Sequence, residues 1–171
     1  MDKKELGLTD NKKLVLCAFG SLGSSKMNEI VINSMSKFEN KDYEVLFITG
    51  KDSYEELSKI SVPSNVIMVP YIENTPRIMK QTDLFISRAG ALFLSEIIAL
   101  NLPSILVPSP YVPDNHQYKN AKELEDKDAC VLIEKKDLTS DILVSSIDKL
   151  INDNKKGILS LDAGNVFEYF K

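Results

Sequence analysis

The residues best suited to chemistry lie in one ten-residue stretch, SRAGALFLSE, at positions 87–96. A short β-prone run precedes the stretch and apolar residues recur at helical spacing after it, so we expect a strand to end near Ser87 and a helix to begin near Gly90. A helix start presents unpaired backbone N–H groups and the positive end of the helix dipole, and a glycine lets a ligand approach the backbone closely. The stretch is therefore typical of a phosphate-binding turn.

Two charged side chains flank this turn. Glu96, one turn into the helix, could accept hydrogen bonds from neighbouring hydroxyl groups, and Arg88 precedes the helix with a fixed positive charge. A diphosphate on the helix start and a ribose diol on the carboxylate would suit a sugar nucleotide. A glycine-bearing turn also occurs in α/β domains of every kind, in which Glu96 would be a solvated helix residue and Arg88 a surface ion-pair partner.

The rest of the chain alternates apolar runs with helical patterns. We expect strands at residues 14–19, 43–48, 66–69, 83–86, 104–107 and 129–133. Helical patterns follow most of them, among them 54–60, 116–127 and 138–151, the last with a Thr139 or Ser140 cap. Strands that alternate with helices favour an α/β fold with a Rossmann-like, doubly wound parallel sheet of about six strands.

Four loops follow strands, at residues 20–25, 70–74, 87–91 and 108–116. In a doubly wound sheet, ligands bind outside the carboxyl ends of the strands, where the strand order reverses. The loops would share that edge, and their convergence is stronger evidence for a site than any one of them. The first loop, GSLGSS, lacks the lysine of a P-loop and the full GxGxxG pattern, so binding of a nucleoside triphosphate or NAD is not supported.

Composition narrows the class of protein. The chain has 171 residues, a net charge of −4 and 43% apolar residues, which suits one globular domain and gives no reason to expect nucleic acid as a partner. No run is long and apolar enough to cross a membrane, and the polar start is unlike a signal peptide, so we expect a cytoplasmic location. Cys17 and Cys130 lie in apolar runs and are expected to be buried thiols; with a single histidine, they make a zinc site improbable.

Four segments, FGSLGS, VPYIENTP, DLFISRAGALFLSEIIALNLPSILVPSP and DNHQYKNAKEL, resemble the carboxyl-terminal half of the MurG family. These bacterial enzymes transfer N-acetylglucosamine from UDP-N-acetylglucosamine to the lipid-linked muramyl-pentapeptide precursor of peptidoglycan. The resemblance runs from about Lys13 to Ile151. It implies the C-terminal half of a GT-B glycosyltransferase, which binds the donor without a metal or other cofactor. Residues 14–152 would form the donor-binding domain, residues 1–13 a lead-in from an interdomain linker, and residues 153–171 a break and a terminal helix.

Motif by motif, the resemblance and the phosphate-binding turn give the following expected donor-binding residues: Ser21, Ile72, Arg88, Gly90, Ala91, Leu92, Phe93, Glu96, His116 and Gln117. The resemblance implies that the backbone of Ile72 pairs with the uracil and that Glu96 takes the ribose hydroxyls. Backbone groups of residues 91–93 would hold the diphosphate, with Ser21 near the phosphates. Arg88 would lie beside the nucleotide and could stabilise the departing UDP. The last two residues of the set would contact the donor sugar.

Three positions depart from the family's motifs. Phe19 replaces a glycine, Ala89 replaces a serine, and His116 replaces the first of two glutamines that contact the sugar. An imidazole can still donate or accept one hydrogen bond, so His116 keeps a possible role on the sugar.

The family's amino-terminal half, with its acceptor site and catalytic-base candidate, has no counterpart in the sequence. We therefore expect no catalytic residue here apart from Arg88, no sugar transfer by this chain alone, and a partner domain or partner chain that binds the lipid-linked acceptor at the inner face of the cell membrane. The chain would then be part of a longer transferase or a free-standing donor-binding subunit of a split enzyme. Two other interpretations are open: a non-catalytic UDP-sugar sensor, and a related transferase such as a glycolipid synthase.

Overall fold

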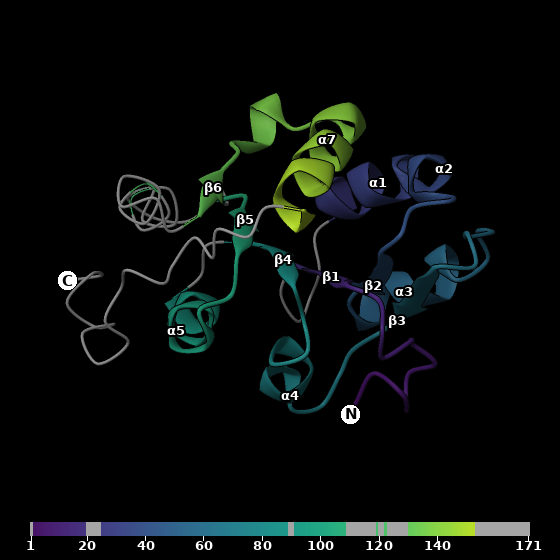
Figure 1. The fold of residues 1–171 in the computed structure, drawn as a ribbon. Coiled ribbons are helices and arrows are strands. Elements are labelled where there is room, and N and C mark those ends of the chain that lie inside the picture. Colours follow the sequence, from purple (N-terminus) through teal and green to yellow (C-terminus); the bar gives the residue numbers. More distant parts are fainter. Residues whose placement is uncertain are drawn as a thin grey trace.

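The computed structural model describes residues 2–19, 25–88, 91–108, 119, 122 and 130–152. Its strands form one parallel sheet of six, in the order β3-β2-β1-β4-β5-β6 (Figure 1). The chain therefore winds outward from β1 through β2 to β3, and then from β4 through β5 to β6. This confirms the predicted doubly wound Rossmann-like sheet, with the reversal of strand order between β1 and β4.

The strands are β1 (Leu14–Ala18), β2 (Glu44–Ile48), β3 (Val66–Val69), β4 (Leu84–Ser87), β5 (Ser104–Leu106) and β6 (Val131–Leu132). Every residue of β1, β2, β4 and β5 is buried, as expected for parallel strands covered on both faces. In the register, Leu16 of β1 is level with Leu46 of β2 and Phe85 of β4.

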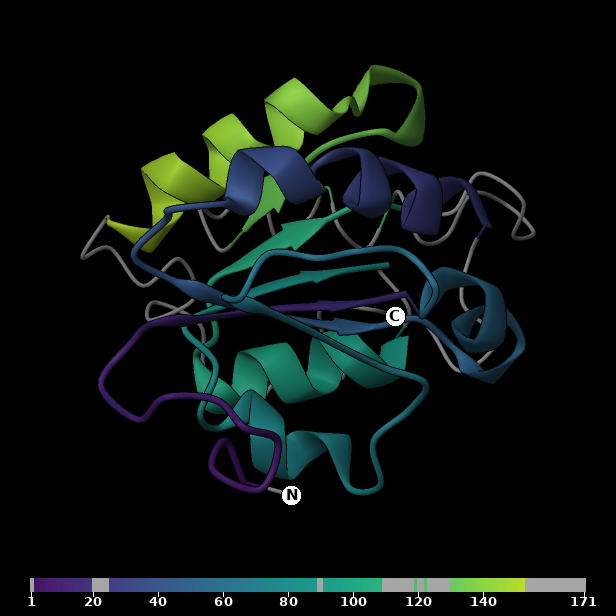
Figure 2. The same cartoon turned by 90° about the vertical axis from the view of Figure 1, so that its right-hand side faces the viewer.

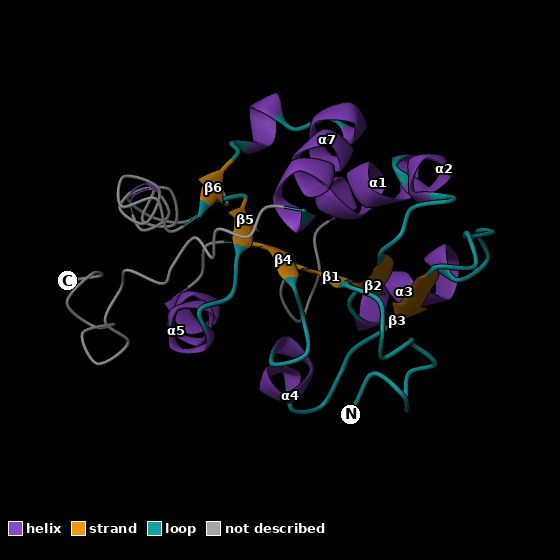
Figure 3. Ribbon diagram, in the orientation of Figure 1, coloured by secondary structure: helices purple, strands orange, loops and turns teal. Residues whose placement is uncertain are grey.

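The helices are α1 (Ser25–Asn33), α2 (Met35–Phe38), α3 (Lys51–Leu57), α4 (Thr75–Met79), α5 (Ala91–Leu100) and α7 (Ser140–Ile151), with a short 3₁₀ helix, η2 (Lys135–Asp137). Figures 2 and 3 show α1, α2 and α7 on one face of the sheet and α4 and α5 on the other. The sheet is thus the middle of three layers.

Two apolar cores result, one on each face of the sheet, because successive strand residues point to opposite sides. From β1, Leu14 and Leu16 enter the core beneath α4 and α5, while Val15 and Cys17 enter the core beneath α1, α2 and α7. Burial raises the pKa of the Cys17 thiol to about 12, so Cys17 is the inert buried thiol that was expected. Cys130, in contrast, is only half-buried.

The lead-in packs against the domain. Leu8 is buried in the same core as Leu14, and the Lys3 ammonium donates to the Lys12 carbonyl at 2.7 Å. The Arg77 guanidinium on α4 donates two hydrogen bonds to the Asp2 carboxylate, at 2.9 and 3.1 Å. Among the described residues, no helix is long and apolar enough to cross a membrane.

One helix cap gives a stability prediction. The Thr139 hydroxyl oxygen accepts a hydrogen bond from the Ile142 backbone N–H at 3.2 Å and so caps α7. Thr139→Ala is expected to lower the free energy of unfolding by about 1 kcal/mol, and the Tm by roughly 2–4 °C, because that N–H loses its acceptor. Ser145→Ala, which removes an exposed hydroxyl from the same helix, should change the free energy of unfolding by less than about 0.5 kcal/mol. Thermal unfolding of the two variants checks this, and equal shifts would contradict it.

Candidate functional site

The predicted turn lies at the carboxyl edge of the sheet, beside the point where the strand order reverses. β4 ends at Ser87, whose hydroxyl is buried and donates to the Arg88 carbonyl at 2.8 Å, and α5 begins at Ala91. The first backbone N–H groups of α5 therefore face this edge, as anion binding at a helix start requires. The structure confirms the expected strand and helix on either side of the turn, whereas residues 89 and 90 lie outside the described residues.

The orientation of α5 follows from its apolar side. Leu94, Ile97 and Ile98 are fully buried against the sheet. Phe93 packs edge-to-face on Phe85 of β4, with ring centroids 5.3 Å apart and an interplanar angle of 84°. An aromatic pair of this kind fixes the first turn of α5 relative to β4.

Glu96 lies on the same helix but is only half-buried. Partial burial raises the pKa of its carboxyl group, because desolvation disfavours the charged form. A carboxylate that lies partly out of water at the predicted binding edge suits the role of a hydrogen-bond acceptor for a diol, since such bonds strengthen as water is excluded.

Arg88 is directed toward the neighbouring strand end. Its side chain is only 9% exposed, and Nη1 donates to the carbonyls of Val107 and Pro108 at 3.4 and 3.2 Å. The guanidinium thus joins the end of β4 to the segment that follows β5. Its positive charge therefore lies at the carboxyl edge of the sheet, where it also has a structural role.

The loop after β3 reaches the same edge. The Ile72 side chain is buried, and its backbone carbonyl accepts a hydrogen bond from the Thr75 hydroxyl at 3.3 Å. The neighbouring Tyr71 is 48% exposed, and the Lys51 ammonium lies 4.1 Å from the centroid of its ring. Sequence analysis did not single out Lys51, because a lysine after a strand and a glycine carries no specific signal by itself.

Ile72, Arg88, Phe93 and Glu96 thus belong to segments that follow the carboxyl ends of β3 and β4, namely the loop after β3, the residue after β4 and the first two turns of α5. Ala91 and Leu92 occupy the start of α5, where their backbone groups were expected, and their side chains are not described. The remaining predicted site residues, Ser21, Gly90, His116 and Gln117, lie outside the described residues. No cluster of three potential metal ligands occurs within the described part of the chain.

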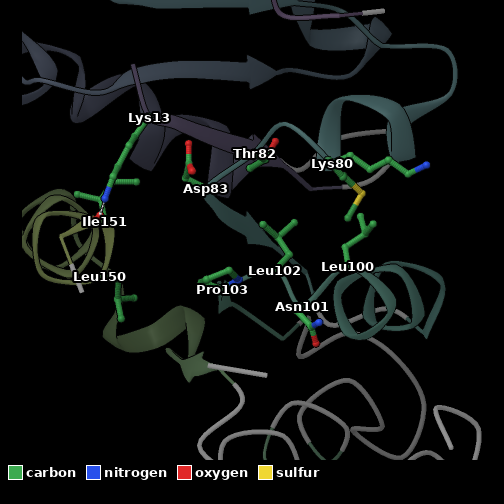
Figure 4. Close-up of a pocket in the computed structure, with 11 residues that line it drawn as sticks. Lys13, Lys80, Thr82, Asp83, Leu100, Asn101, Leu102, Pro103, Leu150 and Ile151 are labelled. Carbon is green, nitrogen blue, oxygen red and sulfur yellow. Dashed lines mark hydrogen bonds between the residues drawn. The ribbon is translucent and has the colours of Figure 1, made fainter. Parts of the chain in front are cut away.

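A cavity of about 350 Å³ opens at the opposite, amino edge of the sheet (Figure 4). Two of its charged groups are engaged within the protein: the Lys13 ammonium donates to the Ile151 carbonyl at 2.7 Å, and the Asp83 carboxylate accepts from the Leu14 N–H at 2.8 Å. Ligands of doubly wound sheets bind at the carboxyl edge, so this cavity is not the predicted donor site.

Comparison with known protein families identifies the family to which the chain belongs. The model of the glycosyltransferase family 28 C-terminal domain matches residues 14–165. The chain belongs to this family. A Bacillus cytotoxicus relative, UDP-N-acetylglucosamine–N-acetylmuramyl-(pentapeptide) pyrophosphoryl-undecaprenol N-acetylglucosamine transferase, is 44% identical over 153 residues, which are 87% of this chain and 42% of the relative. The chain thus spans less than half the length of the curated relatives it matches.

Solved structures of other proteins share this fold. MurG from Acinetobacter baumannii superposes with a TM-score of 0.74 at 25% identity, over 97% of this chain and 47% of that protein. The C-terminal CMP-Kdo binding domain of WaaA, from the same organism, superposes with a TM-score of 0.67 at 12% identity, over 97% and 94% of the two chains. The second likeness shows the fold alone.

Proposed function

We propose that this glycosyltransferase family 28 chain is the donor-binding part of an N-acetylglucosaminyltransferase. The complete enzyme would transfer N-acetylglucosamine from UDP-N-acetylglucosamine to a lipid-linked muramyl-peptide, the step from lipid I to lipid II in peptidoglycan synthesis. The observation that carries the proposal is the 44% identity to the Bacillus cytotoxicus transferase over 87% of the chain. The carboxyl edge supports it, because α5 begins there and doubly wound sheets bind their ligands at that edge.

Different elements at that edge would bind different parts of the donor. The N–H groups at the start of α5 and the helix dipole would hold the diphosphate, with Ser21 and Gly90 beside it. Glu96 would accept hydrogen bonds from the ribose hydroxyls, and the Ile72 backbone would pair with the uracil. His116 and Gln117 would contact the sugar. The positive end of α5 and the Arg88 charge would stabilise the negative charge that develops on the departing UDP.

The other half of the reaction would come from a partner. Activation of the acceptor hydroxyl needs a general base, and the acceptor needs a site of its own. We propose that an acceptor-binding domain or partner chain supplies both, and that the complete enzyme works at the inner face of the cell membrane. The chain alone would then bind UDP-N-acetylglucosamine without transferring the sugar. Supplying the acceptor-binding half should yield product from a lipid I analogue, and product from this chain alone would contradict the proposal.

Donor binding is expected to need no divalent metal, because backbone N–H groups, a helix dipole and a buried guanidinium supply the positive charge around the diphosphate. The Kd for UDP measured by calorimetry should agree within about twofold between buffers that contain EDTA, Mg²⁺ or Mn²⁺, a difference below about 0.4 kcal/mol. Loss of binding in EDTA, with recovery on addition of Mn²⁺, would show that a metal takes part.

A further inference from the structure

An exposed aromatic side chain and a lysine lie together at the carboxyl edge of the sheet. Tyr71, in the loop after β3, is 48% exposed, and the Lys51 ammonium at the start of α3 lies 4.1 Å from the centroid of its ring. Ile48 of β2 is level with Val69 of β3, so the two side chains follow neighbouring strand ends. An exposed cation–π contact contributes little to stability. The contact therefore does little for the fold and leaves a large part of the ring exposed to solvent.

The residue after Tyr71 has the backbone groups that would bind the base. Ile72 is only 7% exposed, so its side chain enters the core while that of Tyr71 faces solvent. Within the described part of the chain, the Ile72 N–H has no acceptor, and the Ile72 carbonyl, which accepts from the Thr75 hydroxyl at 3.3 Å, has a second lone pair. Uracil presents a donor N–H beside an acceptor carbonyl. A uracil paired with these groups would lie one residue away from the Tyr71 ring.

We propose that the Tyr71 ring stacks on the uracil base of the donor and that Lys51 is a positioning residue, which holds this ring in place. The inference rests on the proposed function. Aromatic side chains bind nucleobases by stacking, because every base has a π face. The ammonium occupies one face of the Tyr71 ring, and the base would use the other. A ring that is already held in place loses less conformational freedom when the base binds.

The place of the two side chains in the sheet separates them from the predicted phosphate contacts. In the strand order β3-β2-β1-β4, Lys51 and Tyr71 follow β2 and β3, whereas α5, whose start would hold the diphosphate, follows β4. The contribution of both side chains should therefore fall on the base. A change in either one should weaken uridine and UDP binding by the same factor.

The first test uses Tyr71→Leu, which keeps an apolar side chain and removes the π face. The substitution should raise the Kd values for uridine, measured by NMR, and for UDP, measured by calorimetry, at least about fivefold. Tyr54→Leu, which changes a half-buried tyrosine of α3, is the matched control and should leave both values unchanged. A Tyr71→Leu variant that binds uridine like its control would overturn the inference and make Tyr71 a candidate contact of the acceptor-binding partner.

The second test separates a positioning role of Lys51 from a direct one. Lys51→Met should raise both Kd values about two- to fivefold, and Lys51→Arg should keep the wild-type values, because a guanidinium also stacks on an aromatic ring. Lys59→Met, at an exposed lysine beyond α3, is the control. Added to Tyr71→Leu, Lys51→Met should have no further effect, because Lys51 acts through the ring. A loss for UDP alone, or a full further loss in the double variant, would overturn the positioning role.

A measurement on the wild-type chain needs no substitution. Bound uridine should give NOE contacts between its base protons and the ring protons of Tyr71, since stacking brings the two rings together. Bound uridine without such contacts would overturn the inference and leave the proposed function intact. A folded wild-type chain without affinity for UDP would instead contradict the proposed function itself, and the inference with it.

Discussion

Glu96→Ala is expected to weaken UDP binding by about 10- to 100-fold. Hydrogen bonds to a charged group contribute roughly 1.5–3 kcal/mol, and the ribose diol would lose its acceptor. Calorimetric titration of the variant measures the loss. Glu56→Ala, which removes an exposed carboxylate from α3, is the matched control and should bind UDP like the wild type. A Glu96→Ala variant that binds UDP as tightly as its control would remove Glu96 from the site.

The same carboxylate should be unfavourable for the fold. Burial raises the pKa of Glu96, so the folded protein binds this proton more tightly than the unfolded chain does. Stability therefore decreases as the pH rises from the unfolded pKa through the raised, folded value, and the charged form is disfavoured at neutral pH. Glu96→Gln should then leave the Tm of the ligand-free protein at pH 7 unchanged or higher while it weakens UDP binding. UDP affinity of the wild type should fall as the pH decreases through the raised pKa.

Arg88→Met is expected to lower the stability of the fold strongly. The substitution leaves the buried carbonyls of Val107 and Pro108 without their guanidinium donor, which should cost roughly 2–4 kcal/mol and lower the Tm by roughly 5–10 °C. Arg77→Met is the control, since its ion pair with Asp2 is about half exposed and contributes at most about 1 kcal/mol. Thermal unfolding that shifts no further for Arg88→Met than for Arg77→Met would contradict the structural role.

Ligand preference separates two functions of Arg88. Pro108 begins the segment that leads to His116 and Gln117, the predicted sugar contacts. If Arg88 acts by holding this segment, Arg88→Met should reduce affinity for UDP-N-acetylglucosamine more than affinity for UDP. Equal losses for the two ligands would mean that the guanidinium acts on the diphosphate directly.

Much of the fold could be predicted because its buried strands appear in the sequence as nearly continuous apolar runs. The run LVLCA is apolar throughout and EVLFI is apolar after its first residue, Glu44, which is typical of parallel strands buried on both faces. The predicted strands at 14–19 and 43–48 differ from β1 and β2 by one residue at one end. The helix predicted from Tyr54 begins at Lys51 instead, because Gly50, with a φ of 85°, lets the chain turn directly from β2 into α3.

The site was less predictable, because its details depend on contacts between distant residues. The turn before α5 has a local signature, and the resemblance supplied roles for Glu96 and Ile72. The hydrogen bonds from Arg88 go to carbonyls 19 and 20 residues later, which no local pattern encodes. Asn28 of α1 is only 3% exposed and donates to the Thr49 carbonyl at 3.1 Å, although a polar residue in an amphipathic helical pattern is normally assigned to the solvent face. Its burial depends on the position of Thr49, which the sheet brings beside α1.

Calorimetric titration of the chain with UDP-N-acetylglucosamine, UDP-glucose, UDP and GDP tests directly whether it binds a UDP-sugar donor. Both UDP-sugars and UDP are expected to bind at one site per chain, with N-acetylglucosamine preferred over glucose, and GDP is not expected to bind. A folded chain that binds none of the uridine ligands, or that binds GDP as tightly as UDP, would contradict this expectation.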